Sequence, residues 1–190
     1  MTYIYLGVAL FFGCHLYSML LPASRDRLKA RMGENVFKGL YAAASLIGVG
    51  LLVYGYSQAW ATGEGTAQVY DPPAWGRHVA MLLVLVGFIL VAASHGKGNL
   101  RAFVRNPMSI GVGLWALGHL LANGMKVDLW LFGPFLVLAA LDIIVCTVRG
   151  KVPDFTPRSR SDIVAVIAGM VLYVVFLLLF HPYVLGVRVV

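Results

Sequence analysis

Long apolar runs are the feature that most limits how this chain can fold. Six runs of about 20 residues match the length that an α-helix needs to cross the roughly 30 Å hydrocarbon core of a bilayer. They cover residues 2–21, 36–60, 74–94, 105–124, 129–147 and 163–180, and the last is expected to end at His181 and Pro182. With 60% hydrophobic and only 12% charged residues, the chain has more apolar side chains than one soluble core could bury. The sequence therefore predicts an all-α integral membrane bundle of six transmembrane helices, forming a single domain over residues 1–190.

The basic residues lie mainly on one side of the predicted bundle. Twelve of the fifteen Lys and Arg residues fall in the first, third and fifth loops, and only Arg77, Lys126 and Arg188 lie on the other side. By the positive-inside rule the three basic loops are cytoplasmic, which places both termini in the periplasm of a bacterial inner membrane. The net charge of +7 then reflects topology and attraction to membrane lipids rather than to nucleic acid, since short separate loops form no continuous basic stripe.

His119 is the ionisable residue that most needs an explanation. It lies in the fourth apolar run, on the same helical face as Gly111 and Trp115 and one turn before Asn123. An ionisable side chain within a membrane helix is costly without a partner, so it marks a candidate functional site. A b-type haem needs imidazoles in an apolar slot between helices, small residues beside the macrocycle and basic groups near its propionates. His119 and its neighbours provide this set, so the sequence predicts haem b as a cofactor.

Two other histidines are candidate partners for His119 on the iron. At 1.5 Å per residue, His15 lies about 20 Å inward from the outer face and His119 about 10 Å from it. Two imidazoles that bind opposite sides of one iron can span this difference in depth, given metal–imidazole bonds of about 2 Å. His78 lies nearer the depth of His119. Asp142 lies at the depth of His15 and is placed to orient that imidazole through a hydrogen bond.

Each of these side chains also has a purely structural explanation. His119 and His15 have an alternative explanation as buried polar groups that hydrogen-bond to a neighbouring helix. Asp142 is equally explained as the partner of a basic loop residue. His95 and His181 lie at the ends of apolar runs, where a solvated imidazole at the membrane interface is the simpler expectation.

Several sequence blocks resemble the NnrU family. They are His15, residues 33–46 (GENVFKGLYAAASL), 72–78 (PPAWGRH), 105–108 (RNPM), 115–124 (WALGHLLANG) and 131–133 (LFG). The family includes bacterial proteins associated with nitric oxide and nitrate respiration and the plant 15-cis-zeta-carotene isomerase, a membrane protein that uses haem b. The resemblance implies that His15 and His119 are the haem-iron ligands.

The chain departs from the family pattern at three places. Asn106 stands where many members have a histidine, and Ala116 stands where the plant isomerase has a cysteine one turn before its second haem histidine. Residues 54–60 lack a further histidine of the plant enzyme. A mechanism in which a thiolate replaces imidazole on the iron is therefore not expected here.

Three functional classes remain open at this point. The first is a haem-dependent isomerase or redox protein that acts on a lipid-soluble substrate such as a carotenoid. The second is a non-enzymatic accessory, sensing or assembly factor for nitric oxide or nitrate respiration, and the third is a structural protein whose histidines only form hydrogen bonds. The basic corner at 105–107 also suits an anionic cofactor, although topology alone explains its charge. No phosphate-binding loop, serine elbow or pair of carboxylates on one helix predicts hydrolysis.

The charge distribution makes the topology testable. A cysteine introduced at Thr66 or Val190 should react with a membrane-impermeant thiol reagent in intact cells, because both positions are predicted to be periplasmic. A cysteine introduced at Ser159 should be spared. Labelling of the Ser159 variant from outside would contradict the predicted orientation.

Overall fold

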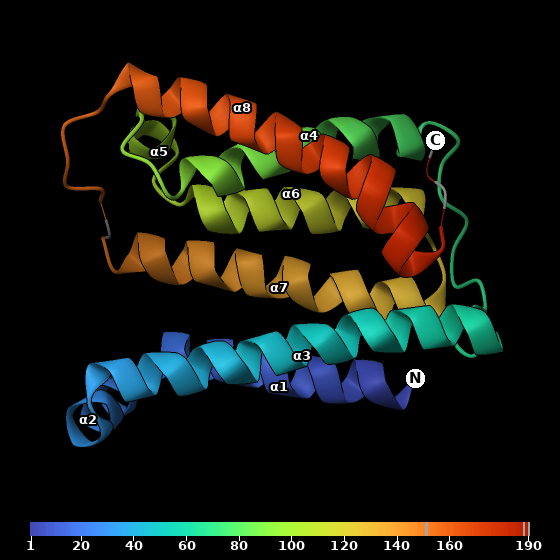
Figure 1. Cartoon of the computed structure of the whole chain (residues 1–190), viewed down its shortest axis with the longest axis horizontal. Helices are drawn as coiled ribbons and strands as arrows, with labels where there is room; N and C mark the ends of the chain where they lie inside the picture. The colour runs from blue at the N-terminus through green and yellow to red at the C-terminus, as the bar shows by residue number, and fades with distance from the viewer. Residues whose placement is uncertain (151, 188, 190) are drawn as a thin grey trace. The chain divides into compact units, whose positions relative to one another are not determined.

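A computed structural model describes residues 1–150, 152–187 and 189 of the chain. Lys151 and Arg188, which enter the charge count, and Val190, a labelling position, lie outside the described residues. In the described part the chain is mostly helical and contains no β-strand, which confirms the predicted all-α membrane fold (Figure 1).

The helices fall into two compact units. Their bounds are α1 (Thr2–Leu20), α2 (Pro22–Met32), α3 (Glu34–Thr62), α4 (Gly76–Ala93), α5 (Asn99–Val104), α6 (Pro107–Ala122), α7 (Lys126–Val148), α8 (Ser159–Val175) and the π-helix η1 (Phe176–Leu185). Residues 1–67 form one unit with α1 to α3, and residues 68–190 form the other with the remaining helices.

Five helical stretches in the described residues are long and apolar enough to cross a membrane. They are α1, α3, α4, α7 and the continuous stretch of α8 and η1. The sixth predicted span, α6, is apolar but has only 16 residues, which gives a length of about 24 Å. The count of six spans therefore stays a prediction, and the helix in question is the one that carries His119.

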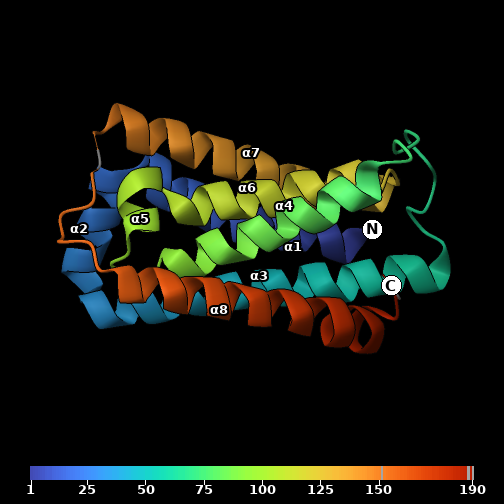
Figure 2. The same ribbon diagram turned by 90° about the horizontal axis from the view of Figure 1, so that it is seen from above.

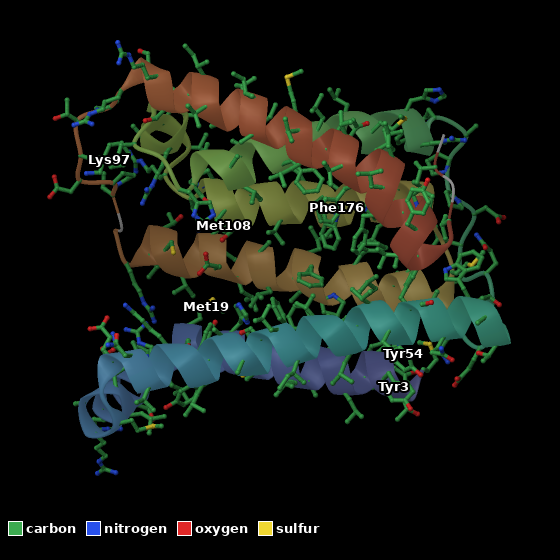
Figure 3. All side chains as sticks on the ribbon, viewed as in Figure 1. Tyr3, Met19, Tyr54, Lys97, Met108 and Phe176 are labelled. Atoms are coloured by element: carbon green, nitrogen blue, oxygen red, sulfur yellow. The ribbon has the colours of Figure 1, made fainter. Side chains whose placement is uncertain are left out.

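In the first unit, α1 packs along α3 through small residues. A Cβ atom added to Gly48 would lie 2.9 Å from Phe11, and one added to Gly55 would lie 2.8 Å from Ile4. Such close approach maximises van der Waals contact, which drives helix association in lipid. At one end of this interface the rings of Tyr3 and Tyr54 meet edge to face, with centroids 5.0 Å apart (Figure 3).

The basic connection after the first span folds as α2. Pro22 occupies its first turn, where a missing N–H is tolerated. Gly33 joins α2 to α3 with a φ of 87°, a value that favours glycine. Glu34 then pairs with Lys38 at 2.8 Å and with Lys29 at 3.6 Å, which ties the start of α3 to α2.

In the second unit, α4 lies between α6 and α8, and α7 packs against α6 (Figure 2). Glycines form both of the contacts with α4. A Cβ added to Gly111 of α6 would lie 2.6 Å from the carbonyl oxygen of Gly87, and one added to Gly169 of α8 would lie 2.5 Å from Ile89. The two helices that flank α4 are therefore held at backbone contact distance.

The structure corrects the predicted end of the last helix. His181 and Pro182 do not terminate it, because the helix continues as η1 to Leu185. Pro182 lacks an N–H and would clash with a carbonyl one α-helical turn earlier. The wider turn of a π-helix, in which paired residues are five apart, accommodates this proline and keeps the chain helical.

The contact between α4 and α6 gives a stability prediction. Gly111→Ala should lower the free energy of unfolding by about 1–3 kcal/mol, because the new Cβ would overlap the Gly87 carbonyl. Gly113→Ala is the matched control on the same helix, since its Cβ would meet only the Ala139 methyl at 3.4 Å. The control should be neutral or stabilising by up to about 1 kcal/mol, from the higher helix propensity of alanine. Unfolding in detergent followed by circular dichroism measures both, and equal losses would contradict the packing argument.

Candidate cofactor-binding site

His119 lies near the C-terminal end of α6 and is held in one tautomer. Its Nδ1 atom is 2.8 Å from the carbonyl oxygen of Trp115, one turn earlier. Because a carbonyl only accepts hydrogen bonds, Nδ1 must donate, and Nε2 of the neutral ring keeps its lone pair. A backbone carbonyl bonded to the far nitrogen is the usual support of a metal-binding histidine.

Aromatic side chains surround the His119 ring. The ring stacks on Phe132 of α7, with centroids 4.4 Å apart and planes within 19°. Trp115 lies 5.1 Å from His119 and meets the rings of Phe132 and Phe135 edge to face. Trp115 therefore forms an apolar wall beside the imidazole.

A second imidazole faces His119 in the same unit. The ring centroid of His181, in η1, lies 6.2 Å from that of His119, and the two planes are parallel within 5°. The Nδ1 atom of His181 donates to the carbonyl of Phe176 at 2.6 Å, so this ring also keeps a lone pair on Nε2. Phe176 itself contacts Phe88 of α4, with centroids 5.1 Å apart (Figure 3).

Asn123 closes the end of α6 behind His119. Its side-chain amide donates to the His119 carbonyl at 3.0 Å, and its backbone N–H donates to the same oxygen at 2.9 Å. The Tyr70 hydroxyl donates to the carbonyls of Leu120 and Asn123, the latter at 2.7 Å. Burial raises the pKa of Tyr70, which keeps this hydroxyl protonated as a donor. Asn123 therefore fixes the backbone of His119.

Two other predicted site residues have different surroundings. Gly111 faces Gly87 of α4, so the space left by its missing side chain is filled by that helix. His78 lies in the first turn of α4 and is exposed. Within the described residues it makes no ring contact with His119, so the structure does not bring this predicted pair together.

His15 belongs to the first unit and is oriented in the same way as His119. Its Nδ1 donates to the Phe11 carbonyl at 2.8 Å, and its ring stacks on Phe11 at 4.1 Å and lies 5.3 Å from Tyr41. Because His15 and His119 lie in different units, their pairing on one iron stays a prediction.

Asp142 takes part in a polar group between α6 and α7. Its carboxylate accepts hydrogen bonds from Asn106 at 2.9 Å and Ser109 at 2.5 Å, and the Cys146 thiol lies 3.8 Å away. The amide of Asn106, at the position where many family members have histidine, is therefore bound to this carboxylate. His15, which Asp142 was predicted to orient, is oriented by the Phe11 carbonyl of its own helix. Because Asp142 lies in the other unit, its contact with His15 stays a prediction.

A family comparison identifies the chain. The family described as NnrU protein matches residues 3–189. The chain belongs to the NnrU family. The match covers both units, and neither the curated proteins nor the solved structures contain a protein that matches.

The donor set of this NnrU-family protein fits haem better than a bare metal ion. No three His, Cys, Asp or Glu side chains gather into a metal site in the described part of the chain. Protein-bound zinc needs three or four such ligands, whereas a haem supplies four nitrogens of its own and needs only one or two axial ligands. Imidazoles with bonded Nδ1 atoms and apolar aromatic neighbours meet that need.

The sequence reasoning assigned His181 to the interface and missed its position beside His119. In the predicted topology both histidines lie near the C-terminal ends of spans that run in the same direction. The assumption that His181 and Pro182 end the helix removed His181 from consideration.

Proposed function

We propose that this NnrU-family protein is a haem b-binding protein of the bacterial inner membrane, with both termini in the periplasm and with His119 as an axial ligand. One observation carries the proposal. The Trp115 carbonyl satisfies Nδ1 of His119 and leaves Nε2 unprotonated among aromatic rings. Nε2 makes no hydrogen bond to a described residue, so its lone pair is available to a ligand.

The surroundings of His119 support the same cofactor. Trp115 and Phe132 provide the apolar contacts that a macrocycle requires. Arg77 in the first turn of α4 and Lys126 at the start of α7 lie at the end of the bundle where α6 finishes, since Gly76 contacts Leu121 there. Both cations are exposed and are the residues that would hold the propionates.

A lipid-soluble substrate such as a carotenoid is the substrate class that we propose for this site. Haem, when bound, supplies an iron centre able to exchange electrons or to interact with a polyene or a small gas. The protein orients the imidazoles, surrounds them with aromatic rings and excludes water. The exposed apolar residues of α8, such as Ile163 at 60% and Val164 at 65% exposure, suit contact with lipid, from which such a substrate would come.

The second imidazole favours an alternative role. If His119 and His181 both held a haem, no coordination site would be left for a substrate, and the haem would supply electron transfer or sensing. On this alternative the protein is an accessory, sensing or assembly factor for nitric oxide or nitrate respiration.

The role of His119 in retaining haem can be tested on the full-length protein. His119→Ala should abolish haem retention, or leave a five-coordinate spectrum, because the Nε2 ligand is lost. Absorbance of the purified protein in the Soret region measures this, and added imidazole should restore the spectrum. His95→Ala is the matched control, since His95 is exposed at the other end of α4. Full haem retention and an unaltered spectrum in His119→Ala would contradict the assignment.

The isomerase and accessory roles differ in a cellular assay. Expression of the protein in cells that accumulate cis polyenes should change their isomer ratio, and the His119→Ala variant should not. Pigment extraction and chromatography measure the ratio. An unchanged ratio with fully haem-loaded protein would instead favour the accessory role.

A further inference from the structure

We propose that His181 is the second axial ligand, opposite His119, so that one iron is held entirely by the unit formed by residues 68–190. The inference rests on the proposed haem binding and goes beyond it, because the family resemblance implies His15 in this role. The structural basis is the facing pair of imidazoles contributed by α6 and η1.

The separation of the two rings matches a shared metal. A metal–imidazole bond is about 2 Å long and the ring centre lies about 1 Å beyond the nitrogen, so two rings on one ion have centroids about 6 Å apart. The observed separation of His119 and His181 is 6.2 Å. Rings in direct stacking contact are closer, as the 4.4 Å between His119 and Phe132 shows.

The helices that carry the pair have no close backbone contact with each other. Among the described residues, α6 and η1 do not pack against each other, since α6 contacts α4, α5 and α7, whereas η1 contacts α8. The two imidazoles therefore meet through their side chains, from separate elements. This is the arrangement that two axial ligands on opposite sides of a macrocycle require, because their backbones must stay far apart.

Both rings are prepared for coordination in the same way. Nδ1 of His119 donates to a carbonyl four residues earlier, and Nδ1 of His181 donates to one five residues earlier, the spacing of a π-helix. Each bond leaves the Nε2 lone pair free for a metal. The π-helix is therefore the local structure that orients the His181 ring beside His119. Such segments are frequent at functional sites.

The other histidines are weaker candidates on the same criteria. His78 and His95 are exposed, and neither ring is oriented by a hydrogen bond within the described residues. His15 is oriented in the same way as His119, but it lies in the other unit.

Spectroscopy of the full-length protein loaded with haem b tests the inference. The wild-type protein should be low-spin and six-coordinate. His181→Ala should retain haem but become high-spin, and added imidazole should restore the low-spin spectrum. His15→Ala should stay low-spin, and so should Tyr183→Phe, a matched control in η1 at a residue that is 83% exposed.

The outcomes separate this inference from the proposed function. If the wild-type protein takes up no haem, both fail. If it takes up haem but is five-coordinate, or if His181→Ala stays low-spin while His15→Ala becomes high-spin, haem binding stands and the assignment of His181 is overturned.

Two measurements do not depend on the folding of the alanine variant. His181→Met should stay low-spin with a higher reduction potential, because a thioether ligand favours ferrous haem. An unchanged potential would count against His181. Electron paramagnetic resonance of the ferric wild-type protein should show a rhombic low-spin signal, as expected for axial imidazoles with parallel planes. A strongly anisotropic signal, typical of perpendicular planes, would overturn the proposed pair.

Discussion

The contact between the backbones of α4 and α6 at Gly87 and Gly111 is the constraint on which the second unit depends. Lipid offers helices no hydrophobic gain on association, so van der Waals contact between closely approaching backbones must hold them. The same helix α4 receives α8 at Gly169. Because α6 and α8 share α4 as their support, these glycine contacts fix the position of α6, which carries His119, relative to α8, which continues into the His181 helix η1.

Backbone carbonyls solve the problem of placing imidazoles in an apolar bundle. A carbonyl in a helix has two lone pairs and uses one for the helical hydrogen bond, so it can also accept from a side chain. His15, His119 and His181 all use a carbonyl of the preceding turn in this way. The arrangement satisfies one nitrogen, needs no additional buried polar residue and leaves the other nitrogen able to coordinate. Hydrogen bonding and metal binding are therefore complementary explanations of these residues.

The helices were predictable because their length and apolar composition follow directly from the thickness of a bilayer. His119 could be chosen as a candidate site residue because an ionisable side chain in such a helix is costly without a partner. Gly111 was predicted to lie on the same helical face as His119. The two residues are eight positions apart, and at 3.6 residues per turn their directions around the helix axis differ by about 80°. This drift explains why Gly111 faces α4 while His119 faces Phe132 and His181.

The position of the His181 ring beside His119 could not be predicted from the sequence. Proline normally ends or kinks an α-helix, and hydrophobic periodicity does not distinguish an α-helix from a short π-helix. A pairing of His15 with His119 could likewise not be derived from the sequence, because the depth of a residue along its span does not show which helices are neighbours.

The two facing imidazoles are anchored unequally, and this bears on which function the site performs. His119 sits on a helix that packs against α4 and α7 and whose end is closed by Asn123 and Tyr70. His181 sits beside Pro182 in a π-helix whose contacts among the described elements are with α8 and, through Phe176, with Phe88 of α4. A haem held by both imidazoles would supply electron transfer, whereas a haem held by His119 alone would leave its iron accessible to a substrate. Of the two residues that would hold a haem, His181 is therefore the more weakly anchored, since its helix makes fewer contacts with the rest of the unit.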